Sequence, residues 1–113
     1  MSQITTHVLD TSKGKPAANI PILLEQSLGI NKWQEIALGS TNKDGRASNL
    51  LTDGKILEKG IYRISFDTDT YFKNNKIDGF YPMVSIIFKI ESSDHYHVPL
   101  LLNPYGYSTY RGS

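Results

Sequence analysis

Apolar and polar residues alternate at a period of two in short segments, and turn-forming residues separate those segments. Residues 61–67 show the pattern clearly, with Tyr62, Ile64 and Phe66 sharing one side. Successive side chains of a β-strand point to opposite faces, so such a segment buries one face and leaves the other wetter. The repeated pattern predicts an antiparallel all-β domain, and about six to eight strands at this spacing predict a two-sheet sandwich.

The turn residues set the expected limits of the strands. Strands are expected over residues 4–9, 20–26, 32–38, 46–51, 61–67, 81–90 and 95–102, with a final strand or ordered tail over residues 105–113. Residues 68–74 break the alternation, and Thr68 or Asp69 can cap the start of a helix there. The sequence therefore predicts one short helix among the strands.

Length and charge narrow the class of protein. The 113 residues carry a net charge of +1, which fits one domain, residues 1–113, whose small core makes subunit association a natural supplement. There is no run of like charges, so neither nucleic acid nor an anionic membrane surface is an expected partner. The chain has no cysteine, which excludes disulfides, thiolate nucleophiles and sulfur ligands to a metal.

The two ends of the sequence bear on localisation. The N-terminus reaches an alternating segment by Ile4 without the basic and apolar stretches of a signal peptide. No apolar run approaches the ~18 residues of a membrane helix, and the ending is not the Ser-Lys-Leu type that the peroxisome reads. We therefore expect a cytoplasmic protein with no membrane segment.

The three histidines are the first candidates for chemistry, because imidazole can take and return a proton near neutral pH. His95 and His97 are two apart in an expected strand, so their side chains share a face. Together with His7 they would also be the ligand set of a catalytic zinc site. The alternative is that these rings cap a sheet edge with ordinary hydrogen bonds.

Arg46 and the C-terminal tyrosines allow two interpretations each. Arg46 follows an Asp-Gly turn, where it is either a solvated flank or a planar donor that grips a carbonyl and keeps a neighbouring histidine neutral. Tyr105, Tyr107 and Tyr110 can stack on a flat ligand or pack at an interface. Glycine-rich nucleotide motifs, phosphate loops, serine elbows and helical zinc-protease motifs are all missing from the sequence.

Several separated motifs together resemble a known family. They are Thr6-His7-Val8-Leu9-Asp10 with Gly14-Lys15-Pro16-Ala17, Asn42-Lys43-Asp44-Gly45-Arg46, His95-Tyr96-His97-Val98-Pro99-Leu100-Leu101 and the ending Tyr110-Arg111-Gly112-Ser113. In this order they resemble the transthyretin-like 5-hydroxyisourate hydrolases, from about His7 to the last residue. The ending matches the tetrapeptide that separates these hydrolases from transthyretin, the hormone carrier of the same fold.

The resemblance implies a transthyretin-like (prealbumin-like) β-sandwich of two four-stranded sheets with one short helix. It implies a homotetramer, a dimer of dimers with active sites in clefts between the dimers. It also implies hydrolysis of 5-hydroxyisourate, the unstable product of urate oxidation, to 2-oxo-4-hydroxy-4-carboxy-5-ureidoimidazoline, with no cofactor or metal. The catalytic residues of the family fall on His7, Arg46 and His97, and its substrate-binding residues on Tyr110, Arg111, Gly112 and Ser113.

Opening a cyclic amide needs an activated water, a group that stabilises the oxyanion and a proton for the departing nitrogen. A neutral His7 or His97 would take the proton from water, and Arg46 would hold the negative charge. The sequence leaves open which histidine is the base and what His95 does. Two alternatives stand beside this hypothesis: a transthyretin-like protein that binds a small ligand without catalysis, and a zinc hydrolase that uses all three histidines.

Overall fold

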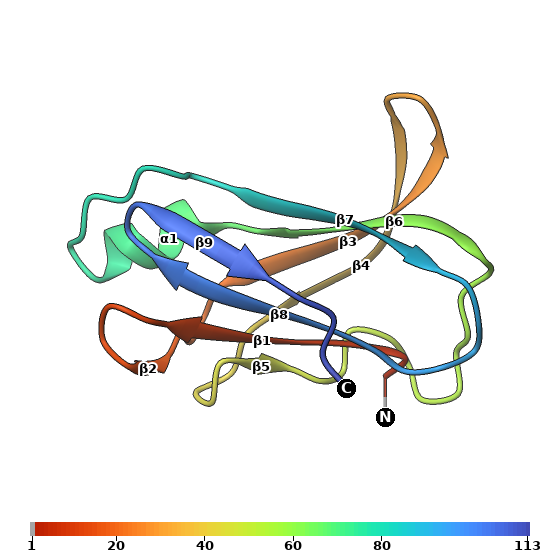
Figure 1. Cartoon of the computed structure of the whole chain (residues 1–113), viewed down its shortest axis with the longest axis horizontal. Helices are drawn as coiled ribbons and strands as arrows, with labels where there is room; N and C mark the ends of the chain where they lie inside the picture. Colours follow the sequence, from red (N-terminus) through yellow and green to blue (C-terminus); the bar gives the residue numbers. More distant parts are fainter. Residues whose placement is uncertain (1) are drawn as a thin grey trace.

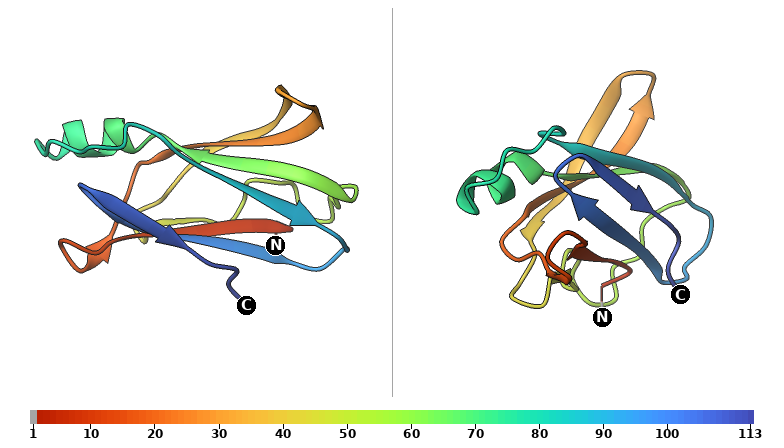
Figure 2. Two further views of the ribbon diagram at one scale, coloured as in Figure 1. Left: turned by 45° about the horizontal axis from the view of Figure 1, so that its top comes forward. Right: turned by 60° about the vertical axis from the view of Figure 1, so that its left-hand side comes forward.

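The structure, a computed structural model, describes residues 2–113 and consists of two β-sheets stacked face to face (Figure 1). Its elements are β1 Ile4–Asp10, β2 Lys15–Pro16, β3 Pro21–Gly29, β4 Lys32–Ser40, β5 Arg46–Ala47, β6 Gly60–Phe66, α1 Thr68–Asn74, β7 Val84–Ile90, β8 Tyr96–Asn103 and β9 Gly106–Thr109. Figure 2 shows the sheets as separate layers, with α1 at one end and the β3–β4 hairpin projecting at the other. Within residues 2–113, no helix is long and apolar enough to cross a bilayer.

The two sheets differ in size. One is antiparallel and has four strands in the order β4-β3-β6-β7. The other has the order β2-β1-β8-β9, with β5 also paired to β1. It has five strands where four are expected, because β2 and β5 are two-residue strands that pair with successive parts of the same edge of β1.

The pairing of β1 with β8 is parallel, whereas the sequence pattern predicts antiparallel pairing. Parallel neighbours need a long connection, and here all four strands of the other sheet lie between β1 and β8 in the chain. The parallel register sets Thr5 opposite His97. Residues from the two ends of the chain therefore meet on one face of the five-stranded sheet.

The helix over residues 68–74 is confirmed, but its cap lies one residue earlier than expected. The Asp67 carboxylate accepts a hydrogen bond from the backbone N–H of Thr70 at 3.1 Å. The two residues expected to cap the helix, Thr68 and Asp69, lie inside its first turn. The Asp69 carboxylate instead pairs with Lys73 one turn later, at 2.8 Å.

Two expected strands are shorter in the structure. The Thr68 hydroxyl donates to the Tyr81 carbonyl, and the Asp69 N–H donates to the Pro82 carbonyl. Because these carbonyls bond to the start of α1, β7 begins at Val84 rather than at residue 81. Residues 46–51 pair only at Arg46–Ala47, and the leucines at the end of that segment enter the core instead.

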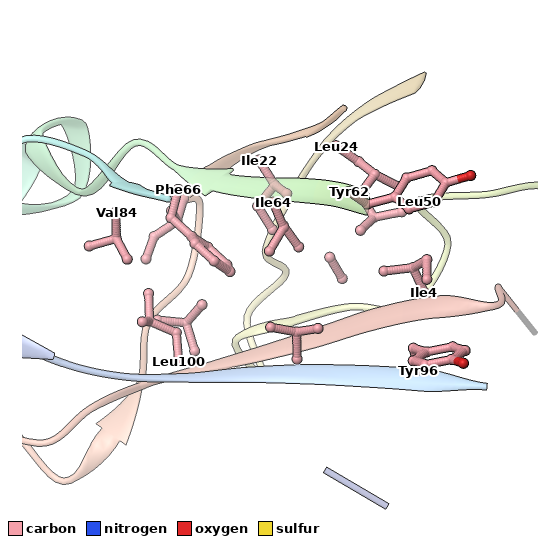
Figure 3. Packing of buried hydrophobic residues seen from close by; sticks show 14 of the residues in the cluster. Ile4, Ile22, Leu24, Leu50, Tyr62, Ile64, Phe66, Val84, Tyr96 and Leu100 are labelled. Carbon is pink, nitrogen blue, oxygen red and sulfur yellow. The ribbon is translucent and has the colours of Figure 1, made fainter. Parts of the chain in front are cut away.

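Alternation along β1 and β8 separates the core from the outer face of the five-stranded sheet. Ile4 of β1 and Leu100 of β8 are fully buried and face Tyr62 and Phe66 of β6 across the core (Figure 3). Burying a side chain of this size contributes about 1.5–3 kcal/mol relative to leaving it exposed. The odd-numbered residues of β1 take the opposite, outer face, and this face carries the histidines.

Candidate active site

Arg46 lies beside His7 because β5 pairs with β1. The antiparallel register makes His7 and Arg46 direct partners, and the side chains of direct partners leave the same face with Cβ atoms about 4.5–5.5 Å apart. The preceding turn holds Arg46 in place, since Oδ1 of Asn42 accepts from the backbone N–H of Asp44 at 2.9 Å and of Arg46 at 3.0 Å.

Gly45 allows this turn to approach β1 closely. Its φ is +73°, in the left-handed region that favours glycine. Its carbonyl accepts the N–H of Val8 at 2.7 Å, and a Cβ at this position would meet the Val8 carbonyl oxygen at 2.5 Å. The Asp-Gly turn that the sequence predicts therefore places Arg46 at the outer face of β1.

His97 meets β1 from the other side. Thr5 and His97 are partners in the parallel register, and Oγ1 of Thr5 lies 2.7 Å from Nδ1 of His97 and 2.8 Å from Nε2 of His95. The two imidazole rings are stacked, with centroids 6.3 Å apart and planes 27° apart. One buried hydroxyl thus joins both rings of the His-x-His pair.

These groups surround an open cavity of about 210 Å³. The cavity is lined by Thr5, Thr6, Arg46, Ser48, His95, His97 and Ser113. The structure therefore brings together Arg46, His97 and Ser113 from the predicted set. His7 is not part of the lining, but it lies next to Arg46 in the sheet and contributes to the electrostatic environment of His97.

The site favours the neutral form of His7 and His97 near neutral pH. Burial lowers the pKa of His97 below its usual 6.5. The His95 ring when protonated, the Arg46 guanidinium and the His7 ring when protonated lower it further. Burial and the Arg46 guanidinium also lower the pKa of His7, while the Asp44 backbone and carboxylate oppose this shift. A neutral imidazole can accept a proton, so both rings meet the electrostatic requirement for a general base.

The C-terminal tail packs against His97. The Gly112 N–H donates to the His97 carbonyl at 2.9 Å, and Ser113 reaches the cavity. The Arg111 guanidinium lies over the ring of Tyr96, 4.5 Å from its centroid. Tyr110 and Arg111 line a neighbouring cavity of about 380 Å³, which has His97 in common with the first.

Gly112 leaves no room for a side chain. A Cβ at this position would meet Cδ2 of His97 at 2.5 Å. We predict that Gly112→Ala displaces the ring or the tail and lowers kcat by about 10- to 100-fold, as expected when a reacting group is misplaced by about 1 Å. The matched control is Gly106→Ala, where a Cβ would meet only Asn103 at 3.7 Å. Steady-state kinetics should separate the two variants, and equal kcat values would refute this role of Gly112.

The structure does not form the three-histidine zinc site. No group of three or more His, Cys, Asp or Glu side chains that could hold a metal ion is found among residues 2–113. Sequence reasoning missed Thr5, Thr6 and Ser48 as cavity residues. Thr5 has a sequence signal, because it lies two residues before His7 on the same face of the strand. No comparable signal marks Ser48.

Together the fold and this cavity define a transthyretin-like β-sandwich with a candidate hydrolytic site. Transthyretin from Sparus aurata superposes with a TM-score of 0.90 and 31% identity, covering 99% of this chain and 97% of that one. The structure of Klebsiella pneumoniae 5-hydroxyisourate hydrolase gives a TM-score of 0.84 and 32% identity, covering 97% and 92%. The 5-hydroxyisourate hydrolase of Salmonella typhimurium is 44% identical over 111 residues, 97% of this chain and 80% of that protein.

The sequence model of the HIUase/Transthyretin family matches residues 4–112. The chain belongs to this family. The resemblance inferred from these separated motifs is thereby confirmed.

Proposed function

We propose that the chain is a hydrolase of purine degradation that converts 5-hydroxyisourate to 2-oxo-4-hydroxy-4-carboxy-5-ureidoimidazoline. The hydrolase name of the Salmonella typhimurium relative, at 44% identity, supports this substrate. The observation that carries the proposal is the presence of Arg46 and His97 in one cavity on the outer face of the sheet. A non-catalytic binding protein of the transthyretin type is not favoured, since it has no need of a neutral imidazole beside a guanidinium.

The proposed reaction begins with His97, the histidine that lines the cavity. Its neutral ring takes a proton from a water molecule, whose oxygen adds to the carbonyl carbon of the cyclic amide. Arg46 donates hydrogen bonds to the oxyanion that forms on the carbonyl oxygen. As the ring C–N bond breaks, the imidazolium returns the proton to the leaving nitrogen. His7 lies beside Arg46 in the sheet, and because its pKa is also lowered it is a second neutral imidazole next to the guanidinium.

The proposed substrate contacts lie in the tail. Ser113 lines the cavity and would hydrogen-bond the flat substrate. Gly112 has no side chain and so leaves room for the His97 ring. Tyr110 and Arg111 would act from the neighbouring cavity, where they adjoin the other side of His97.

The assay for this function follows the absorbance of freshly generated 5-hydroxyisourate, which also decays without enzyme. Catalytic amounts of the protein should accelerate the decay many-fold and repeatedly, with product formed in large excess over protein. Retention of the compound by the protein without turnover would instead support the binding alternative. Decay at the spontaneous rate with no retention would reject both.

The pH dependence of kcat/KM follows from the lowered pKa of His97. The base must be neutral, so activity should be constant near neutral pH and fall only as the pH drops through a midpoint below 6.5. Removing the Arg46 charge should move that midpoint upward, because this charge is one cause of the lowered pKa. Measuring kcat/KM between about pH 5 and 8 tests both statements. A midpoint above 6.5 in the wild type would contradict them.

We also propose that the chain forms a homotetramer, a dimer of dimers. The cavity supports this, because Arg46, His95 and Ser113 are exposed around it on the single chain, and a facing dimer would close it. Sedimentation equilibrium should give about four times the 12.7 kDa chain mass. A fully active monomer would reject the proposal that a facing dimer closes the cavity.

One domain over residues 1–113 and a cytoplasmic location stay predictions from the sequence.

A further inference from the structure

Thr5 is a residue of β1 whose hydroxyl joins two imidazole rings. Only 6% of its surface is exposed, and its Oγ1 lies within hydrogen-bond distance of Nε2 of His95 and Nδ1 of His97. Among residues 2–113, these two nitrogens are the only hydrogen-bond partners of the hydroxyl. The motifs in the sequence assign no role to this threonine.

A hydroxyl has one proton to donate, and this limits the protonation of the two rings. The Thr5 hydroxyl is largely buried, so its proton favours an acceptor within the protein. Of its two hydrogen-bond partners, only an unprotonated ring nitrogen can provide that acceptor. At least one of the two facing nitrogens must therefore be unprotonated. It follows that His95 and His97 cannot both be imidazolium ions while the hydroxyl donates its proton to one of the two rings.

The nitrogen of His97 that is left for the cavity determines which of the two rings accepts the Thr5 proton. The contact with Thr5 uses Nδ1 of His97, which leaves Nε2 as the nitrogen for a molecule in the cavity. A neutral imidazole carries one proton, so a base that is unprotonated at Nε2 must be protonated at Nδ1. Nδ1 then donates to Thr5, and the Thr5 proton is left for Nε2 of His95.

We propose, on the basis of the function proposed above, that Thr5 is a positioning residue that fixes the tautomer of His97. Its hydroxyl accepts from Nδ1–H of His97 and donates to Nε2 of His95, so His97 presents an unprotonated Nε2 to the cavity. When Nε2 takes a proton from water, the same two hydrogen bonds persist and orient the imidazolium. No proton has to move between His97, Thr5 and His95.

Other charged groups also act on His97 and would shape its titration. The pKa of His97 is lowered by His95 before β8, Arg46 on β5 and His7 on β1. The neighbouring cavity that includes His97 is also lined by Lys89 and Glu91 around the end of β7 and by Arg111 in the tail. The Thr5 hydroxyl is neutral, so removing it changes hydrogen bonding and leaves all these charges in place. A change of tautomer in a Thr5 variant is therefore not an effect of altered charge.

The test compares Thr5→Val, which keeps the shape and removes the hydroxyl, with Thr5→Ser, which keeps the hydroxyl. Thr11→Val is the matched control, since Thr11 lies beyond β1, away from the cavity, and is exposed. Long-range ¹H–¹⁵N spectra of the full-length protein report which nitrogen of His97 carries the proton, without substrate. The kinetic readout is kcat, KM and the pH profile with freshly generated 5-hydroxyisourate.

In the wild type and in Thr5→Ser we expect His97 protonated at Nδ1, and in Thr5→Val a shift toward protonation at Nε2. We expect kcat of Thr5→Val to fall by roughly 10- to 100-fold, which is part of the rate gain from positioned proton transfer, and KM to change little. Thr5→Ser keeps the hydroxyl, so we expect it to retain most of the wild-type rate. An unchanged tautomer in Thr5→Val, or wild-type protonation at Nε2, would overturn the proposal.

The two readouts separate this inference from the proposed function. A Thr5-dependent tautomer in a protein that does not accelerate the decay of 5-hydroxyisourate rejects the function and keeps the hydrogen-bond assignment. An active protein whose tautomer ignores Thr5 rejects the inference alone. If Thr5→Val unfolds, the tautomer of the wild type and Thr5→Ser still decides, because protonation at Nε2 in both contradicts the proposal.

Discussion

Replacing Arg46 with glutamine should lower kcat for 5-hydroxyisourate by about 10²–10³-fold, the usual cost of removing one donor to a developing oxyanion. Arg46 lines the cavity with His97, and its charged guanidinium can donate strong hydrogen bonds to a developing oxyanion. Glutamine keeps a donor but loses the charge and much of the reach. Because the oxyanion exists only after water adds, KM should change much less than kcat.

The control for the Arg46 variant lies in the same turn. Lys43 is exposed and three residues away, so Lys43→Gln removes one positive charge without touching the cavity. We expect this variant to keep the wild-type kcat and thermal midpoint. If Arg46→Gln and Lys43→Gln lose activity equally, the effect comes from net charge and the oxyanion role is wrong.

Replacing His97 with asparagine should lower kcat by about 10²–10⁴-fold, the range attributed to positioned proton transfer. The asparagine side chain reaches about as far as Nδ1, so it can keep the hydrogen bond to Thr5 that His97 makes at 2.7 Å. It offers no group at the position of Nε2 and cannot accept a proton near neutral pH. The thermal midpoint should therefore stay close to that of the wild type while turnover is lost.

A second variant checks the position of the lost group. His97→Gln places its terminal amide near the former Nε2 and also lacks a basic nitrogen, so we expect a loss of the same order. Urea unfolding of both variants, followed by fluorescence of Trp33, would show whether the fold is retained. An active His97→Gln would mean that His97 orients water without taking its proton.

The sheet faces and the helix could be predicted from sequence because both depend on local patterns. Alternation placed Tyr62, Ile64 and Phe66 on one face, and all three are fully buried. The helix occupies residues 68–74 as expected. Strand limits were less predictable where a proline carbonyl bonds outside the sheet, as Pro82 does with Asp69.

The pairing of distant strands could not be predicted in this way. Alternation shows which residues of β1 share a face, and so groups Thr5 with His7. It does not show that β8 lies parallel to β1 with His97 opposite Thr5, because this register depends on packing between the two ends of the chain. The resemblance supplied His7, Arg46 and His97 as a set, but only the register brings Thr5 into contact with His97.

The most direct measurement is the rate of 5-hydroxyisourate decay with the Arg46→Gln, His97→Asn double variant, compared with the wild type at equal concentration. If one guanidinium and one imidazole open the ring with water, the double variant should retain less than about 0.1% of the wild-type rate above spontaneous decay. Its fold should be intact by circular dichroism. Losses of at least about 10²-fold are expected from each of the two groups. A folded double variant that keeps more than about a tenth of the wild-type rate would therefore show that the chemistry takes place elsewhere.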